Sequence, residues 1–442
     1  MIKPNELIEK FGISGLVRTA DDYYARLDDA TSILAKPFND AFSGAYDLYY
    51  LGMILAGIRL APTMTVLDFG GGVGWLSRYL QQMRCNVICL DPSAAALRLA
   101  QDLFAKYPII GTPLVPPQFL EFDGLRIGLP DASVDRIISF AAFHHVPNPD
   151  HILTEMYRVL KPGGVVGFYE PGLGHSSAPQ SQLEMKYFNV LENDIHLHEL
   201  IPFATSIGFD EPRFRLSMTP FHDVTFDEFM AVHNDATLSK GLSKVMQQST
   251  QQSYLFFLTK GKYKGDSRLR VGLGGKLFFD AGRATTLDTL DKDTITLQLR
   301  AVNTGGSTWL HMSLLDIGKV MLGARLMSPN GELLREGYAS ASLAADVSPG
   351  AQAIFDLTLP CPDNGSYSVI VDIVAHHVCW FESNGSIPLK LNLNVFQNAD
   401  GRRVMEIEDT TSQDSVAQNP PIAEIRQGSR FSIMRWLSRL RK

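Results

Sequence analysis

The sequence has little cysteine, no long apolar run and no excess of positive charge. Its 442 residues include only four cysteines, which are too few and too scattered for a disulfide framework or a zinc site. No stretch reaches the roughly 18 uncharged apolar residues of a membrane-spanning helix. The first residues, MIKPNELIEKFG, lack the apolar core of a secretory signal. These absences predict a protein of a reducing, cytoplasmic compartment.

The charge balance argues against a general nucleic-acid binder. Lys and Arg together number 40 and Asp and Glu 47, which leaves a net charge of −7. The composition is 45% hydrophobic and 20% charged, as in ordinary globular proteins. The length favours two or three domains.

The chain changes its hydrophobic pattern several times. Residues 1–60 carry apolar side chains at helical spacing and predict a helical cap. Residues 61–262 alternate short apolar strands, such as TVLDF and NVICLD, with helix-length amphipathic segments, which predicts an α/β domain with a parallel sheet. The run SYLFFLTK (253–260) predicts its last strand.

The second half follows a period of two. Residues 263–284 are rich in Gly and Lys and predict a linker. Residues 285–397 contain alternating segments separated by turns such as SPNGE and PDNGS, which predicts an antiparallel β-sandwich. Residues 398–428 predict a flexible tether. Residues 429–442 (SRFSIMRWLSRLRK) carry five basic and no acidic side chains, and predict an amphipathic helix that binds an anionic membrane or a partner protein.

A glycine loop is the most informative feature. Asp68 ends an apolar strand, and Gly70, Gly72 and Gly74 then lead into a helix. Glycines allow the backbone to turn sharply and to approach a ligand, and free amides at a helix start favour an anionic group. Asp91 ends the next strand, where a carboxylate can bind ribose hydroxyls or cap the following helix.

The spacing of the glycines distinguishes between two candidate cofactors, a dinucleotide and S-adenosylmethionine. The dinucleotide pattern G-x-G-x-x-G fails from Gly70, because its last position is Trp75, and from Gly72, because its last position is Ser77. The pattern D-x-G-x-G-x-G instead suits S-adenosylmethionine (SAM), with Asp68 toward the ammonium end and the loop amides toward the carboxylate.

Residues 50–170 resemble a class I SAM-dependent methyltransferase of the type 11-like group. The resemblance is carried by VLDFGGGVGWLSRYL, VICLDPS, FDGLRIGLPDASVDRIIS and FHHVPNPDHILTEMYRVLKPGG. It implies a seven-stranded Rossmann-like sheet with an antiparallel last strand. It also implies that Asp68 and the three glycines bind the methionine end, that Asp91 binds the ribose, that Asp123 faces the adenine amino group, and that Phe140 and Ala141 line the cleft. Asp123 has the alternative of a solvated turn acid.

Four residues near the strand ends are candidates for acceptor chemistry. A hydroxyl acceptor benefits from a base that takes its proton, and histidine has a suitable pKa. His145 and His144 are the candidate bases, although His145 has packing as an equal alternative. Glu170 and His175 are candidate substrate-lining residues. No pair of His or acidic residues shows tight metal-ligand spacing, so no metal site is predicted.

The antiparallel region resembles modules attached to enzymes and exporters of bacterial surface polysaccharides. Trp309, Trp380 and Phe381 are candidates for stacking on sugar rings, with packing in the core as the alternative. The leading hypothesis is O-methylation of a sugar in a surface polysaccharide or lipid-linked glycan, in the cytoplasm or at the inner face of the membrane. Two alternatives stay open: a quinone or natural-product methyltransferase whose sandwich serves dimerisation, and a SAM-binding scaffold without catalysis.

Overall fold

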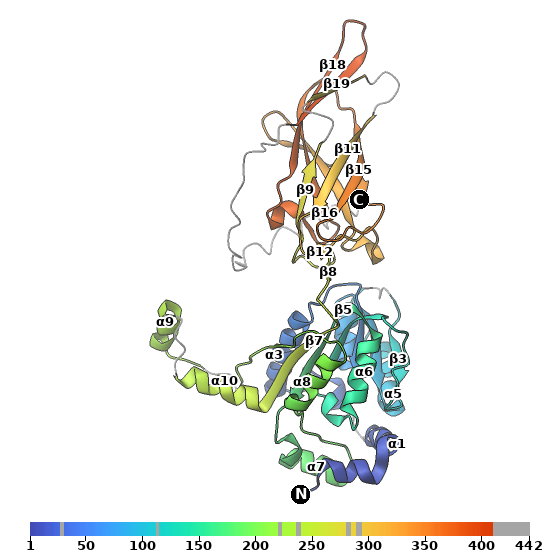
Figure 1. Cartoon of the computed structure of the whole chain (residues 1–442), viewed down its shortest axis with the longest axis vertical. Coiled ribbons are helices and arrows are strands. Elements are labelled where there is room, and N and C mark those ends of the chain that lie inside the picture. Colours follow the sequence, from blue (N-terminus) through green and yellow to red (C-terminus); the bar gives the residue numbers. More distant parts are fainter. Residues whose placement is uncertain are drawn as a thin grey trace.

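The computed structural model describes residues 1–26, 31–111, 115–219, 223–235, 240–279, 284–288 and 294–409. The predicted helix at 429–442 therefore lies outside the described residues, and so does most of the predicted tether. Among the helices of the described part, none is long and apolar enough to cross a membrane. Figure 1 shows an N-terminal body of sheet and helices and a C-terminal body of strands.

The N-terminal body is built on one seven-stranded sheet. Its strand order is β3-β2-β1-β4-β5-β7-β6, in which β1 to β5 run parallel and β7 runs antiparallel to β5. This is the predicted Rossmann-like sheet, with SYLFFLTK as its antiparallel strand. The bounds are β1 Thr65–Phe69, β2 Asn86–Asp91, β3 Gln118–Glu121, β4 Val134–Phe140, β5 Leu160–Pro171, β6 Arg213–Phe214 and β7 Ser253–Thr259.

Helices flank this sheet because apolar residues cover both of its faces. Leu67, Ile137 and Phe168 belong to one buried cluster, and Val66, Ile138 and Val165 belong to a second. The helices of this body are α1 Pro4–Ala25, α2 Thr31–Leu34, α3 Ala41–Gly57, α4 Trp75–Gln82, α5 Ala94–Lys106, α6 Pro149–Val159, α7 Pro179–Tyr187, α8 Leu197–Ser206, α9 Phe226–Asp235 and α10 Lys240–Gln252.

The prediction of one helical cap over residues 1–60 is wrong for its second half. Ile54 and Ile58 pack with the sheet residue Val165 in a single buried cluster, so α3 is a flanking helix of the sheet. Asp40 caps its start by accepting bonds from the amides of Phe42 and Ser43. Among the described residues of the predicted cap, those that line the cavity at the carboxyl ends of the strands belong to α1.

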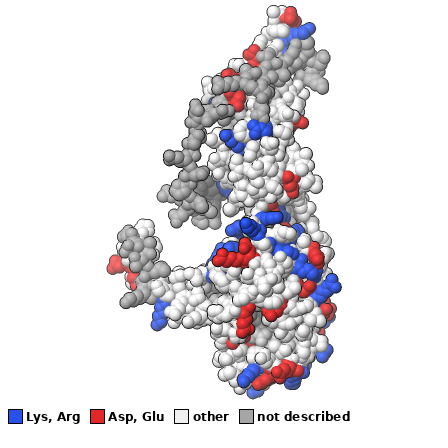
Figure 2. Space-filling view, viewed as in Figure 1, with Lys and Arg blue, Asp and Glu red and all other residues white. Residues whose placement is uncertain are grey.

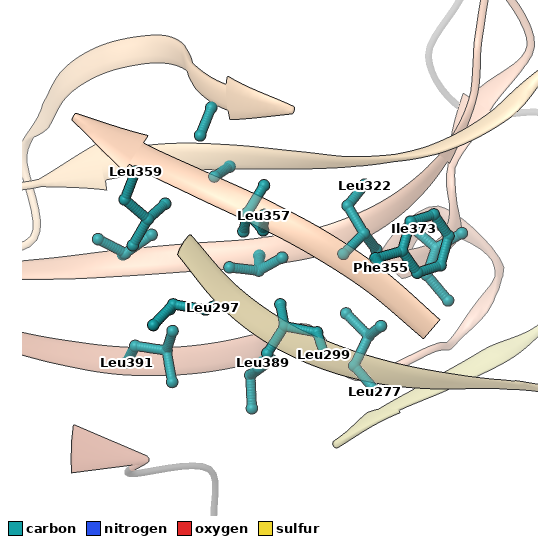
Figure 3. Close-up of a cluster of buried hydrophobic side chains, with 14 of the residues drawn as sticks. Leu277, Leu297, Leu299, Leu322, Phe355, Leu357, Leu359, Ile373, Leu389 and Leu391 are labelled. Carbon is teal, nitrogen blue, oxygen red and sulfur yellow. The ribbon is translucent and has the colours of Figure 1, made fainter. Parts of the chain in front are cut away.

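The C-terminal body contains two antiparallel sheets that share one hydrophobic core. One has the order β10-β19-β18-β16-β13-β14, with β17 paired to β16, and the other has the order β15-β11-β9. Leu297 and Phe355 from the smaller sheet pack with Leu322 and Leu391 from the larger one (Figure 3). The bounds are β9 Gly275–Phe278, β10 Ala284–Asp288, β11 Thr294–Asn303, β13 Val320–Met327, β14 Leu333–Ser342, β15 Gln352–Pro360, β16 Gly365–Ala375, β17 Cys379–Trp380, β18 Leu389–Gln397 and β19 Arg403–Asp409.

Two predicted connections are wrong in part. Residues 263–284, predicted as a linker, contain β9 and the core residues Leu273 and Leu277. Within residues 398–428, predicted as a tether, β19 pairs with β18 along its full length. β9 and β19 are short and lie next to segments rich in Gly or polar residues. Their alternating patterns therefore span too few residues to be recognised from the composition.

An ionic junction connects the two bodies. Arg268 lies 3.3 Å from Asp135, near the start of β4 in the N-terminal body, and 2.8 Å from Asp266. Asp266 belongs to β8 (Gly265–Asp266), which pairs with β12 (Ser307–Thr308) of the C-terminal body. In Figure 2, basic side chains gather on the edge of the N-terminal body that faces the C-terminal body.

Candidate active site

The glycine loop between β1 and α4 adopts backbone angles that favour glycine. Gly70, Gly72 and Gly74 have φ values of +67°, +52° and +75°, and Gly74 begins α4 as its N-cap. A Cβ at position 72 would lie 2.9 Å from the hydroxyl of Tyr24, so α1 closes over this loop. The loop therefore combines a left-handed backbone with a close neighbour that a side chain would displace.

Two buried carboxylates flank the loop. Asp68 at the end of β1 accepts a hydrogen bond from Ser77 at 2.7 Å, and burial raises its pKa to about 7. Asp91 at the end of β2 accepts bonds from the amides of Gly72 at 2.8 Å and Ser93 at 2.9 Å, and burial raises its pKa to about 6. Asp91 thus fixes the loop conformation and lines the cavity described next.

A cavity of about 680 Å³ lies at the carboxyl ends of the strands, beneath α1. Gly70, Asp91 and Phe122 line one part of it, and Tyr23 and Tyr24 of α1 form part of its cover. Asp21 attaches this cover to the domain, because its carboxylate accepts bonds from Ser93 Oγ at 2.9 Å and from the Ala95 amide at 2.7 Å. Those partners begin α5, so Asp21 caps that helix from another element.

Three predicted cleft residues have different placements. Ala141 lines the cavity with a φ of +52°. The prediction that Phe140 lines the cleft is wrong: Phe140 is not among the cavity-lining residues, and its ring packs edge-on against Trp75, with ring centroids 5.5 Å apart. The structure does not bring the Asp123 carboxylate to the cavity: it is exposed and accepts bonds from the amides of Leu125 and Arg126, which hold its pKa below the usual value. Its position fits the alternative of a turn acid.

Behind the cavity wall, Glu170 holds His144, which lines the cavity; Glu170 itself does not line it, so its prediction as a substrate-lining residue is wrong. Glu170 is fully buried at the end of β5, and its Oε1 accepts bonds from Ser139 Oγ at 2.8 Å and the Phe143 amide at 2.9 Å. Its Oε2 lies 2.8 Å from Nδ1 of His144. Because an ionised carboxylate only accepts hydrogen bonds, Nδ1 of His144 carries the hydrogen and its Nε2 is free for other partners.

His145 and His175 meet a second buried acid, Glu192. Nδ1 of His145 lies 2.6 Å from the Leu191 carbonyl oxygen and 3.5 Å from Glu192 Oε1. Nε2 of His175 lies 2.6 Å from Glu192 Oε2, and these bonds to histidines lower the pKa of Glu192. Desolvation and the adjacent His144 lower the pKa of His145 to about 4, so its imidazole is neutral at pH 7.

The four predicted residues His144, His145, Glu170 and His175 thus share one cluster, which Glu192 completes. Sequence reasoning missed Glu192. This residue lies in LENDIHLHEL, which follows a helix and not a strand, and no motif or residue spacing there indicates a functional site. Tyr23 and Tyr24 were missed because an α1 residue reaches the cavity only through the docking of the whole helix. The neighbouring His196 and His198 are exposed and do not join the cluster.

The three aromatic residues predicted to stack on sugars differ in how far they are buried. Trp309 and Phe381 are fully buried and pack against each other, so the prediction of sugar stacking is wrong for both. Trp380 is half-buried, its ring lies against Gly323, and the guanidinium of Arg325 lies 5.0 Å from the ring centroid. A side chain at position 323 would clash with this ring.

The sheet order, the glycine loop and the two acids define a Rossmann-like domain of the SAM-dependent methyltransferase class. Consistent with this class, residues 67–168 match the family model described as "Methyltransferase domain". The chain thus carries a SAM-dependent methyltransferase domain, and SAM is its cofactor.

Known proteins similar to this chain share mainly that domain. Malonyl-[acyl-carrier protein] O-methyltransferase of Marinomonas sp. is 33% identical over 175 residues, which cover 38% of this chain and 60% of that protein. The enzyme of the same name from Pectobacterium atrosepticum is 33% identical over 141 residues, 30% of this chain and 51% of that protein. The chain thus spans about half of the length of these curated relatives. Phosphoethanolamine N-methyltransferase 2 of Haemonchus contortus, solved with SAM, covers 54% of this chain and 61% of its own at 17% identity and a TM-score of 0.36.

Proposed function

We propose that this chain transfers the methyl group of SAM to an oxygen of a small or sugar acceptor. One observation carries the proposal: Gly70 of the glycine loop, Asp91 and three histidines of the cluster line a single cavity. A Cβ at position 70 would lie 2.5 Å from Ala142, so the loop is next to the turn that carries His144 and His145. A cofactor bound along the loop would therefore have its reactive end near the histidines. SAM supplies a methyl group on a sulfonium, which an acceptor oxygen displaces in line.

Within this proposal the residues of the cluster have separate roles. His145 lines the cavity, and because its Nδ1 contacts the Leu191 carbonyl, its Nε2 is the nitrogen that can take the proton that the acceptor hydroxyl loses as its oxygen gains the methyl group. His144 is held by Glu170 and turns its other nitrogen toward Glu192, 3.7 Å away. Glu170 acts as a positioning residue, since its oxygens are occupied by the protein itself.

A sugar of a bacterial surface polysaccharide or lipid-linked glycan is the proposed acceptor. The support comes from the C-terminal body, which we interpret as a β-sandwich module for glycan binding. Trp380 is the aromatic residue of the proposed stacking set that keeps an exposed part, beside Arg325 and its ion pair with Glu382 at 2.9 Å. An aromatic ring next to charged hydrogen-bonding groups is a suitable surface for a sugar ring.

The size of the cavity supports the small-molecule alternative. About 680 Å³ beneath α1 holds a cofactor together with one small acceptor or a single terminal sugar, but not an internal unit of a long chain. The curated relatives named above act on a malonyl group carried by a protein. A quinone, a natural product or a carrier-bound acyl group therefore stands as the second candidate acceptor. Binding of the segment 429–442 to an anionic membrane, or to a glycan-synthesis partner, stays a proposal as well.

One experiment separates these acceptors and tests the proposal. The full chain is incubated with SAM labelled on its methyl group and with saccharide, lipid-linked glycan and small-molecule fractions, and products are identified by mass spectrometry. Labelled methyl on a sugar oxygen supports the glycan proposal, and labelled methyl in the small-molecule fraction supports the alternative. SAM binding without transfer to any fraction would support the scaffold hypothesis.

For the glycan surface, we predict that Trp380→Ala weakens saccharide binding by the full chain at least fivefold, since stacking on the ring is lost. The affinity is measured by titrating the full chain with saccharide in a calorimeter. Phe396→Ala serves as the control, because Phe396 is also a half-exposed aromatic residue but lies on β18. Equal effects of the two variants would contradict the site.

A further inference from the structure

The histidine cluster also contains a set of metal-binding donors, and the proposed base His145 is one of them, so an ion bound there would replace His145 as the group that activates the acceptor oxygen. His144, His145 and Glu192 each offer one nitrogen or oxygen donor, and these donors all lie within 4.8 Å of one another. The two histidines belong to the turn η1 (Phe143–His145) after β4, whereas Glu192 lies between α7 and α8. Their proximity is therefore a product of the fold and not of local sequence. We propose that these three residues bind a divalent transition-metal ion.

The separations are close to those that a shared ion requires. His144 Nε2 lies 3.7 Å from Glu192 Oε2, and His145 Nδ1 lies 3.5 Å from Glu192 Oε1. Metal–ligand bonds of about 2.0–2.2 Å in tetrahedral geometry place neighbouring donors about 3.3 Å apart. The two separations from Glu192 are thus within a few tenths of an ångström of this value, and all three donors lie within 4.8 Å of one another.

Outer partners already orient two of the three donors. Metal-binding histidines usually donate their second ring N–H to a carboxylate or a backbone carbonyl. His144 does so to Glu170 at 2.8 Å. Nδ1 of His145 is the nitrogen near Glu192 and also contacts the Leu191 carbonyl at 2.6 Å, so metal binding would exchange that contact for the ion. The carboxylate of Glu192 is in turn bonded by His175 at 2.6 Å.

The charges of the cavity wall favour a cation at this point. Among the described residues that line the cavity, the acids are Asp91, Glu184 and Glu192, and none is a Lys or Arg. Glu192 is only 5% exposed, and a buried carboxylate needs a positive partner. The described cavity wall thus offers Glu192 histidines but no Lys or Arg, and a bound cation would supply the fixed positive charge.

The donor set selects the class of metal. Two imidazoles and one carboxylate suit Zn²⁺, Co²⁺ or Ni²⁺ better than Mg²⁺ or Ca²⁺, which prefer oxygen ligands alone. Three protein ligands leave a further position open, as in catalytic metal sites. That position would face the cavity and take an oxygen of the acceptor, which would orient the acceptor toward the methyl donor.

Metal binding is measured directly on the full chain, without SAM or acceptor. The chain is freed of metal with a chelator and titrated with Co²⁺ and Zn²⁺, following visible absorption for cobalt and heat for zinc. We expect one ion per chain and the absorption of a four-coordinate cobalt site. Glu192→Gln and His145→Ala should each weaken binding at least tenfold, since each removes one donor.

His311→Ala is the matched control. His311 forms a similar short contact with an acid, 2.6 Å to Asp346, but lies exposed on the C-terminal body. Absence of stoichiometric binding by the wild-type chain, or binding that only His311→Ala weakens, would overturn the proposal. Thermal unfolding of each variant checks that it is folded, and if Glu192→Gln fails to fold, His145→Ala and the wild-type cobalt spectrum decide. Because no methyl transfer is measured, failure here leaves the methyltransferase proposal standing.

Discussion

At the scale of single residues, burial sets the ionisation of the two acids beside the glycine loop. The pKa values of Asp68 and Asp91 are raised to about 7 and about 6, so both carboxyls are partly protonated in the ligand-free protein at pH 6. A bound sulfonium and ammonium would favour the charged carboxylates. Cofactor binding is therefore expected to be linked to proton release.

We predict that SAM binds more tightly as the pH rises from 5.5 to 7.5 and that binding near pH 6.5 releases protons. The raised acids must lose their protons to attract the cation, and above pH 7.5 they are already ionised, so the dependence should level off. Calorimetry in buffers of different ionisation enthalpy measures the protons released. Asp68→Asn should reduce the release, and a pH-independent affinity would be the contrary result.

Glu170 has the highest density of hydrogen bonds in the histidine cluster. We predict that Glu170→Gln lowers the free energy of unfolding by about 1–3 kcal/mol, because an amide cannot accept at both ends and a buried donor is left unsatisfied. Urea unfolding measures the change. The control Glu121→Gln, at an exposed position of β3, should change stability by less than about 0.5 kcal/mol. A loss at Glu170 no larger than that of the control would count against this network.

At the scale of elements, the Asp21 side chain links α1, which covers the cavity, to the start of α5. Asp21 accepts bonds from Ser93 and Ala95 at the start of α5, so the cover of the cavity and the helix after Asp91 are held together. Asp22, the next residue, instead forms an exposed pair with Arg26 at 3.5 Å.

We predict that Asp21→Ala loosens α1 and shortens the residence time of SAM, because the removal of a helix cap costs about 0.5–2 kcal/mol. Hydrogen exchange of residues 4–25 and stopped-flow dissociation of the cofactor measure the two effects. Asp22→Ala is the matched control and should leave both unchanged. Similar exchange in the two variants would show that Asp21 does not hold the cover.

The sheet elements were predictable where each carried a strong local pattern. The strands from β1 to β7 that the sequence marked are buried apolar runs, and the helix-length amphipathic segments between them form α4, α5 and α6. Gly70, Gly72, Gly74 and Asp91 followed from the loop pattern. Asp123 shows the limit of prediction from sequence, because the local sequence does not distinguish an acid that caps a turn from an acid that binds a ligand.

Residues brought together by helix docking were not predictable. Glu192 and Tyr24 enter the cavity from segments whose sequence has no periodic or motif signal for a site. The short strands β9 and β19 were missed for a related reason: four to seven residues next to Gly-rich or polar segments give too little alternation. These two strands are stabilised by pairing with β11 and β18, which are distant or longer strands that a local sequence pattern does not reveal.

At the scale of the whole molecule, Arg268 connects the methyltransferase domain to the C-terminal body. We predict that Arg268→Ala destabilises the junction by about 1–3 kcal/mol, because it leaves buried hydrogen-bonding groups of Asp135 and Asp266 unmatched. Calorimetric unfolding should then show the two bodies melting further apart in temperature. Arg98→Ala, at an exposed position of α5, is the control, and an unchanged melting profile for Arg268→Ala would contradict this account of the junction.

The central claim is that the cavity beside the glycine loop binds SAM, and calorimetry with the full chain tests it most directly. We predict that wild-type protein binds SAM at one site per chain and that Asp91→Ala weakens binding about 10- to 100-fold, as expected for the loss of a buried charged hydrogen bond of about 1.5–3 kcal/mol. Asp102→Ala, an exposed acid on α5, should bind like the wild type. Absence of SAM binding by the wild-type chain, or equal affinity of the Asp91→Ala and wild-type proteins, would contradict the claim.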